Sequence, residues 1–203
     1  MSLTQSQHDR QERMLNVASK LASEGGFDAV QMRTVAADAD VALGTLYRYF
    51  PSKEHLLVSA MLRQIRSLSD RLAVKPAAGL DAASRVGDVL RRANSALQRQ
   101  QNFTIAVVRA LASGDETVAP VVREVRELME TIILQAMGID DPDQRDRLVA
   151  QILQEVWLSA LVAWISGVEP APTVTRKLDD AARLLLGTAQ PNTAQNDRSG
   201  TAS

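Results

Sequence analysis

Apolar side chains recur every three or four residues along most of the chain, which is the spacing of one face of an α-helix. Glycine, proline and aspartate, which favour helix ends, separate these runs. The pattern predicts helices over residues 4–24, 32–39, 43–50, 52–72, 81–99, 103–113, 120–137, 143–166 and 173–187. No segment shows the alternation of a half-buried strand. The sequence therefore predicts an all-α fold of about nine helices.

The predicted helices fall into two units. We expect a small N-terminal unit of three helices over residues 1–51, a larger helical unit over residues 52–187, and a disordered tail of small and polar residues over 188–203. Ser52 and Asp81 are suitable N-caps for two helices of the larger unit, where a side-chain oxygen accepts from a free backbone N–H.

Residues 32–50 contain two short amphipathic helices joined by a three-residue turn, the size and spacing of a helix-turn-helix. On a helical wheel, Leu46 and Phe50 face the core. The outer face carries Gly44, Thr45 and Arg48, flanked by Tyr47 and Tyr49. Glycine lets a backbone approach a duplex, and hydroxyl, phenol and guanidinium groups reach phosphates and base edges. Two short surface helices without a DNA function would show a similar pattern, so the pattern alone leaves both interpretations open.

The residues themselves favour DNA binding. Residues 36–53 read Ala-Ala-Asp-Ala-Asp-Val-Ala-Leu-Gly-Thr-Leu-Tyr-Arg-Tyr-Phe-Pro-Ser-Lys and resemble the signature of the TetR family of bacterial regulators, as does the preceding Gly-Gly-Phe at 25–27. The resemblance implies a homodimer that binds a palindromic operator in double-stranded DNA, and an effector pocket in the larger unit. It implies DNA contacts by Arg33, Leu43, Gly44, Thr45, Tyr47, Arg48, Tyr49 and Lys53.

Two positions depart from the family pattern. Asp40 stands where a turn glycine is frequent, so we expect a left-handed backbone that aspartate tolerates. Ala42 stands where a Ser or Thr cap is frequent, and such a cap contributes about 1 kcal/mol. We expect both changes to affect the choice of operator sequence rather than DNA binding itself.

Stretches at 29–33, 41–53, 55–60, 156–159 and 163–164 are similar to a subgroup of this family, actinobacterial repressors of cholesterol-catabolism genes. The last stretch lies outside the DNA-binding unit, which favours a shared subgroup over a shared motif. The similarity implies a hydrophobic effector, such as a steroid or fatty acyl-coenzyme A thioester, and control of lipid or steroid catabolism. The alternative is a TetR-type regulator of efflux or other metabolism with an unrelated apolar effector.

The sixth, seventh and eighth predicted helices supply candidate walls for an effector cavity, although each residue could equally be plain core. The candidates are Phe103, Val107, Arg109, Leu111, Leu128, Met129, Ile132, Leu153 and Trp157. The eighth helix is apolar on more than one face and must be covered on two sides. The family arrangement implies that its second side joins the ninth helix in a dimer interface containing Leu161, Trp164, Leu178, Ala182 and Leu185.

Arg109 stands inside an apolar run, and two roles for it remain open. It could bind an acidic or phosphate-bearing effector. It could instead reach solvent or pair with a carboxylate such as Glu124 or Glu155. We further expect the helix over residues 52–72 to act as a lever, since it runs without Pro or Gly from the DNA-binding unit to the linker.

Composition limits the remaining possibilities. The chain is 45% apolar and 23% charged, with a formal net charge of -1, as in ordinary globular proteins, so charge alone is a weak indication of DNA binding. The absence of cysteine excludes disulfides and thiolate metal sites and fits the cytoplasm. The N-terminus has no export signal, and the longest mainly apolar stretch, 156–165, is shorter than the about 20 residues of a membrane helix.

Two rival classes fit less well. An enzyme is disfavoured because the chain has only two histidines and lacks a phosphate loop and an H-E-x-x-H motif, so no cofactor or metal is expected. The aspartates at 140–143 lack the glycine and distal glutamate of a calcium loop and fit a helix cap better. A helical interaction protein that has lost DNA binding is disfavoured by the retained Gly44, Tyr47, Tyr49 and Lys53.

Overall fold

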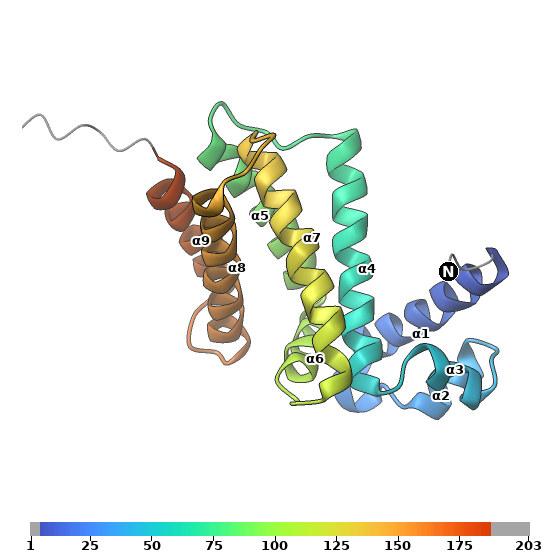
Figure 1. The fold of residues 1–203 in the computed structure, drawn as a ribbon. Helices are drawn as coiled ribbons and strands as arrows, with labels where there is room; N and C mark the ends of the chain where they lie inside the picture. Colours follow the sequence, from blue (N-terminus) through green and yellow to red (C-terminus); the bar gives the residue numbers. More distant parts are fainter. Residues whose placement is uncertain (1–4, 188–203) are drawn as a thin grey trace, which may run out of the picture.

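The computed structural model describes residues 5–187, so the expected disordered tail at 188–203 lies outside the described residues. Within this range the chain forms nine α-helices, one short 3-10 helix and no strand (Figure 1). The helices are α1 (Gln5–Ala29), α2 (Met32–Asp38), α3 (Leu43–Tyr49), α4 (Lys53–Val74), α5 (Ala82–Arg99), α6 (Gln101–Leu111), η1 (Glu116–Val118), α7 (Ala119–Met137), α8 (Gln144–Ile165) and α9 (Ala171–Leu186). The all-α expectation is confirmed, and all helix ends except the C-terminal end of α1 fall within two residues of the predicted ones.

Residues that satisfy free backbone groups set the helix ends. The side chains of Ser52, Asp81 and Asp143 each accept a hydrogen bond from a backbone N–H three residues further on, at the starts of α4, α5 and α8. Gly138 ends α7 in the left-handed conformation, with φ 77°. Gly26 (φ 70°) breaks the helical path of α1, so the predicted end near residue 24 corresponds to this kink.

The first three helices pack around a small core of their own. Val35 of α2 and Leu46 of α3 are fully buried, and Phe50, directly after α3, is 1% exposed. Asp40 lies in the turn between α2 and α3 with φ 53°, the left-handed conformation expected for it. Ala42 provides no side-chain cap for α3. The turn holds α2 against α3 in the arrangement of a helix-turn-helix.

The larger unit is a helical bundle arranged beside α4. In Figure 1, α4 runs from α2 and α3 at one end to the linker before α5 at the other, while α8 and α9 pair on the side away from it. α7 packs against α4, α5 and α8, and α5 packs along α9. α6 contacts α1 of the small unit as well as α4 and α8. The boundary at residue 51 stays a prediction, since α1 and α4 pack together across it.

The structure corrects part of the expected dimer interface. Leu178 and Ala182 are fully buried inside the chain, in a helix that packs along both α5 and α8, and so cannot touch a second copy. Helical periodicity identified this apolar face of α9 but not that α5 covers it. Leu161 is 6% exposed and also faces inward, whereas Trp164 and Leu185 are partly buried and stay candidates for dimer contacts.

α8 is long and apolar enough to cross a membrane by length and composition alone, with a mean hydropathy of 1.6. A helix in a protein core or interface meets the same criterion, so the indication is weak. Only 33% of its most apolar window is buried within the described chain, and Leu148, Leu158 and Val162 are 53%, 47% and 42% exposed. One face of α8 is therefore covered by the bundle and another is open.

Candidate DNA-binding surface and effector cavity

The outer face of α3 has the character expected of a recognition helix. Tyr47 is 47% exposed, and Gly44 and Arg48 are also exposed. A Cβ added at Gly44 would meet nothing within 4 Å, so no packing inside the protein requires glycine there. The absence of a side chain instead leaves room for a close approach by another molecule.

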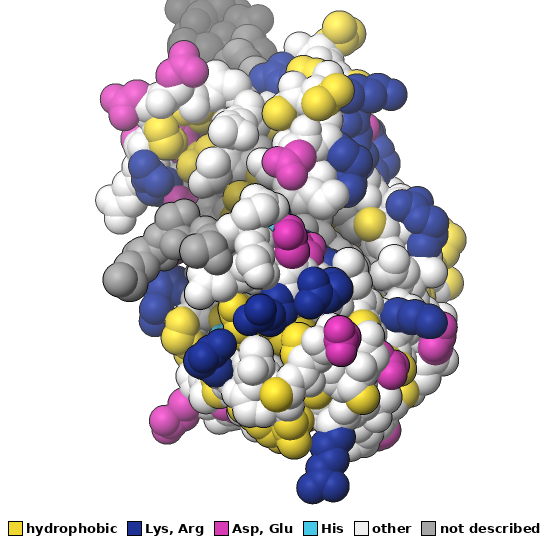
Figure 2. Space-filling model, turned by 90° about the vertical axis from the view of Figure 1, so that its right-hand side faces the viewer, with side chains coloured by type: hydrophobic (Ala, Val, Ile, Leu, Met, Phe, Trp, Pro, Cys, Tyr) yellow, Lys and Arg dark blue, Asp and Glu magenta, His cyan; other side chains and the backbone are white. Residues whose placement is uncertain are grey.

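The other candidate DNA contacts flank this face. Arg33 of α2 is exposed, and Leu43, Thr45 and Tyr49 are partly buried at the edge of α3. Figure 2 shows the side of the molecule that carries α1 to α3, where Lys and Arg side chains lie in a row across the middle of the face with Asp and Glu beside them.

A stack of three side chains joins this surface to α6. The ammonium group of Lys53 lies 3.9 Å from the ring centroid of Phe27, and the guanidinium carbon of Arg109 lies 4.1 Å from the same centroid. Arg109 also donates to both carboxylate oxygens of Asp28, at 3.2 and 3.1 Å. Cation–π contacts of this kind contribute about 0.5–1 kcal/mol at exposed sites.

This geometry corrects the expectation for Arg109. It does not line the cavity described below, and its carboxylate partner is Asp28, not Glu124 or Glu155. Those two glutamates pair with Arg66 and Arg126 instead. Asp28 is 81 positions away in sequence, so helical periodicity could not reveal the pair.

A second connection joins the start of α4 to the segment between α6 and α7. The hydroxyl groups of Ser52 and Thr117 lie 3.1 Å apart, and the carboxylate of Asp115 accepts from the backbone N–H and hydroxyl of Thr117 at 2.8 and 2.7 Å. Hydrogen bonds from Ser52 and Thr117 lower the pKa of Asp115. Burial lowers the pKa of the nearby His55, against the opposing charge of Asp115.

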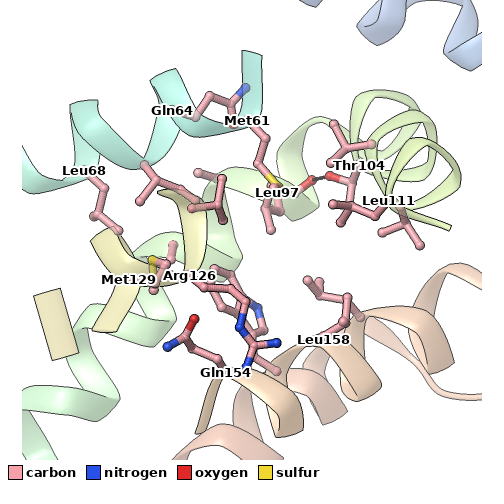
Figure 3. Close-up of a pocket in the computed structure, with 18 of the residues that line it drawn as sticks. Met61, Gln64, Leu68, Leu97, Thr104, Leu111, Arg126, Met129, Gln154 and Leu158 are labelled. Atoms are coloured by element: carbon pink, nitrogen blue, oxygen red, sulfur yellow. Dashed lines mark hydrogen bonds between the residues drawn. The ribbon is translucent and has the colours of Figure 1, made fainter. Parts of the chain in front are cut away.

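An apolar cavity of about 170 Å³ lies between α4, α5, α6, α7 and α8 (Figure 3). Four of the nine candidate effector residues line it: Val107, Leu111, Met129 and Trp157. The candidates that do not line it are Phe103, Arg109, Leu128, Ile132 and Leu153. Phe103, Ile132 and Leu153 are instead 0–2% exposed in the core. Leu161, expected in the dimer interface, lines the cavity.

Sequence reasoning missed two contributions to this cavity. α4 supplies Met61, Ile65 and Leu68, although the helix was expected only to act as a lever. Gln154 of α8 lines the cavity beside Trp157, three residues further along. The available signal was a glutamine within the apolar run of the eighth helix, on the face it shares with Trp157.

A wide groove with several basic residues in its lining adjoins the cavity. It lies between the C-terminal half of α4 and α5 and shares Gln64, Arg71 and Ala96 with the cavity wall. Its cationic residues are Arg71, Lys75, Arg91, Arg92 and Arg99, and Asp70 is its acidic one. Arg91 and Arg92 pair with Asp88, whereas no carboxylate among residues 5–187 pairs with Arg71, Lys75 or Arg99. The groove therefore carries cations without counterions next to an apolar cavity.

No cluster of three or more potential metal ligands occurs within the described part of the chain. The histidines do not approach the cavity wall: His8 lies near the start of α1, and His55 lies at the start of α4. Nothing in the cavity has the nucleophile and base of a hydrolytic site.

Comparison with known proteins supports a relationship along nearly the whole chain. The profile of bacterial regulatory proteins of the tetR family matches residues 14–60, and that of the tetracyclin repressor-like C-terminal domain matches residues 79–185. The HTH-type transcriptional repressor KstR of Mycolicibacterium smegmatis is 40% identical over 187 residues, which cover 92% of each chain. KstR of Rhodococcus jostii is 41% identical over 181 residues, which cover 89% of this chain and 84% of the relative.

Solved structures agree with this relationship. A TetR transcriptional regulator from Rhodococcus sp. RHA1 superposes with a TM-score of 0.84 and 32% identity, covering 92% of this chain and 100% of the other. FadR of Thermus thermophilus, a TetR family repressor in complex with lauroyl-CoA, has a TM-score of 0.64 and 19% identity, covering 95% and 100%. At that identity the second likeness shows the fold alone.

Proposed function

The chain belongs to the TetR family of bacterial regulatory proteins, and from this premise we propose that it is a dimeric repressor released from its operator by a hydrophobic coenzyme A thioester. It is a DNA-binding transcriptional regulator and not an enzyme. The observation that carries the choice of effector is the apolar cavity that continues into a groove with unpaired cations.

The two neighbouring spaces match the two parts of such a thioester. An acyl or steroid body gains free energy by leaving water for the apolar cavity. The phosphates of the coenzyme A part gain charge-assisted hydrogen bonds from Arg71, Lys75 and Arg99 at the rim. The fold itself accommodates acyl-CoA, since FadR holds lauroyl-CoA. The similarity to KstR and the resemblance to repressors of cholesterol-catabolism genes support control of lipid or steroid catabolism.

The size of the cavity supports release by displacement of helices. Sites for drug-sized ligands occupy about 300–1,000 Å³, whereas this cavity measures about 170 Å³. A steroid or long acyl chain must therefore spread the surrounding helices. Two of them are tied to the DNA-binding unit, α6 through Arg109 and α4 through its start at Lys53. Their displacement would change the separation of the two recognition helices, which must match one turn of DNA, about 34 Å.

The open face of α8 supports dimerisation. A shallow groove lined by Ile152, Val156, Ser159 and Lys177 lies between α8 and α9. A second copy of α8 and α9 would cover this groove and the exposed side chains of α8 in a four-helix arrangement. Dimerisation through the open face of α8 also explains why a DNA-binding protein contains a helix this apolar. We place the protein in the cytoplasm.

A titration of operator binding tests the proposal. Fluorescence anisotropy would follow binding to the DNA upstream of the protein's own gene, over a range of salt concentrations and with steroid and fatty acyl-CoA thioesters or the corresponding free acids. We expect steep salt dependence from phosphate contacts and release by a thioester at lower concentrations than by its free acid.

Variants of the groove sharpen this test. Replacing Lys75 and Arg99 by glutamine should weaken release by the thioester about tenfold and leave release by the free acid unchanged, because the acid carries no phosphate. If apolar compounds without phosphate release the protein from its operator, and these variants do not alter that release, the alternative of an efflux-type or other regulator would be supported. Failure to bind DNA at any salt concentration would contradict the role of α3.

A further inference from the structure

The middle of α4 is fastened to α1 by one guanidinium group. Nη1 of Arg63 donates to the carboxylate and the backbone carbonyl of Glu12, at 3.1 and 3.4 Å, and to the side-chain oxygen of Asn16 at 2.6 Å. Nη2 donates to the hydroxyl of Ser19 at 3.1 Å. Because these partners are spaced three or four residues apart, a single side chain of α4 holds successive turns of α1.

The polar partners of α4 change directly after Arg63. Gln64 donates to the side chain of Gln100, between α5 and α6. Arg66 pairs with Glu124 of α7. The side chain of Arg63 is only 22% exposed, and a guanidinium group donates several hydrogen bonds in a fixed geometry. This contact therefore restrains α1 against α4 more firmly than an exposed ion pair would.

α1 carries the connection onward to the turn of the helix-turn-helix. Arg13, next to Glu12 in sequence, donates from Nε to the backbone carbonyl of Ala39 at 3.3 Å. Ala39 is the C-cap of α2 and directly precedes the left-handed Asp40, in the turn that leads into α3. The other end of α3 is joined to α4 by the chain itself, through residues 50–52. Both ends of α3 are thus connected to α4, one by the backbone and one through α1.

We propose that Arg63 is a positioning residue for operator binding: through α1 it fixes the turn before α3 and so sets the angle at which the recognition helix meets DNA. A helix held at one end swivels, whereas a helix held at both ends keeps one orientation. Two recognition helices of a dimer must enter the major groove together, about 34 Å apart, so a variable angle lowers the fraction of protein that is ready to bind. The inference depends on DNA binding and not on the identity of the effector.

Operator binding by Arg63→Met, measured by anisotropy over a range of salt concentrations, tests the proposal. The variant keeps an apolar stem and removes all of the hydrogen bonds to α1. We expect operator affinity to fall about fivefold, as when about one fifth of the protein is in the competent orientation. The slope of log affinity against log salt concentration should not change, because no phosphate contact is lost. A direct phosphate contact by Arg63 would instead reduce that slope by about one.

A double-mutant cycle shows whether Arg63 acts through α1. Asn16→Leu removes the side-chain oxygen that accepts from Arg63. It should weaken operator binding about twofold in the otherwise unmodified protein and have no further effect in the Arg63→Met variant, since the contact is already lost. Arg66→Met is the matched control: the same residue type, three positions further along α4, pairs with Glu124 of α7. This control should leave operator affinity unchanged.

The outcomes separate this inference from the proposed function. A lower melting temperature with unchanged operator affinity would make Arg63 merely structural, and a shallower salt slope would make it a DNA contact; either result overturns the positioning role. Equal effects of Asn16→Leu in both backgrounds would overturn it as well. If Arg63→Met does not fold, Arg63→Lys, which keeps the charge but has one nitrogen in place of two donors to α1, decides the question with the same expected signs. Failure of every thioester to release the operator would contradict the proposed effector and leave the role of Arg63 standing.

Discussion

Replacing Arg109 by alanine distinguishes a coupling role from direct effector binding. The first predicts a lower effector concentration for half-release from the operator, and the second predicts a higher one. Arg109 pairs with Asp28 and stacks on Phe27, outside the cavity. The two charged side chains are 57% and 80% exposed, so their ion pair contributes at most about 1 kcal/mol. The stacking contributes about 0.5–1 kcal/mol. We take about 1 kcal/mol as the net stabilisation of the ligand-free conformation by this side chain.

The effect follows from a two-state equilibrium. If effector binding displaces α6 and breaks this contact, loss of about 1 kcal/mol raises the equilibrium constant for the released conformation about fivefold. Arg109→Ala should therefore lower the thioester concentration for half-release from the operator about fivefold. Operator affinity without effector should change less than about twofold, because the DNA-competent conformation still predominates. Anisotropy with labelled operator measures both quantities.

A matched control removes an ion pair far from the DNA-binding unit. Arg147 of α8 pairs with Glu130 of α7 at 3.2 Å, and its side chain is 51% exposed. Arg147→Ala should leave the half-release concentration unchanged. If Arg109→Ala instead raised that concentration, Arg109 would be an effector ligand, one of the two roles that the sequence left open, and the coupling role would be refuted. No change would show that α6 does not transmit the signal through this contact.

Three further outcomes follow from the DNA-binding surface, the α8 groove and the half-buried histidine. Tyr47→Phe should weaken operator binding about fivefold in anisotropy, through loss of one hydrogen bond of about 1 kcal/mol to DNA; equal affinity would contradict a contact by its hydroxyl. Ser159→Arg places a large cation in the groove between α8 and α9 and should give a monomer by light scattering, whereas Leu80→Asp, at a fully exposed position, should not. Because burial lowers the pKa of His55 below 6.5, the unfolded chain binds the proton more readily, so the free energy of unfolding should fall as the pH drops below 6.5. Urea denaturation at several pH values should show a weaker fall for His55→Gln.

Local features of the fold were predictable because short-range chemistry sets them. Ser52 and Asp81 cap helices, Gly138 ends one, and Asp40 takes the left-handed conformation, all as the sequence indicated. Each outcome depends on a backbone group within a few residues. The same holds for the exposed outer face of α3, whose residues are defined by helical spacing.

The cavity was only partly predictable because long-range packing decides which apolar side chains meet an empty space. Phe103 and Val107 lie one turn apart on α6, yet Phe103 is in the core and Val107 lines the cavity. Periodicity shows that a helix face is apolar but not which neighbour covers it, and this also explains the errors at Leu178 and Ala182. The groove was missed because its free cations come from two separate helices, and their approach is a property of the fold.

α6 presents two faces with separate tasks, and this arrangement affects how such a regulator can diverge. Val107 and Leu111 face the cavity, while Arg109, between them in sequence, faces Phe27. Under the proposed function, substitutions on the first face would change which effector binds and would leave the contact with the DNA-binding unit in place. After gene duplication, one copy could thus change its effector specificity while it keeps the contact between α6 and the DNA-binding unit. Effector specificity and the contact with the DNA-binding unit therefore depend on different faces of the same helix.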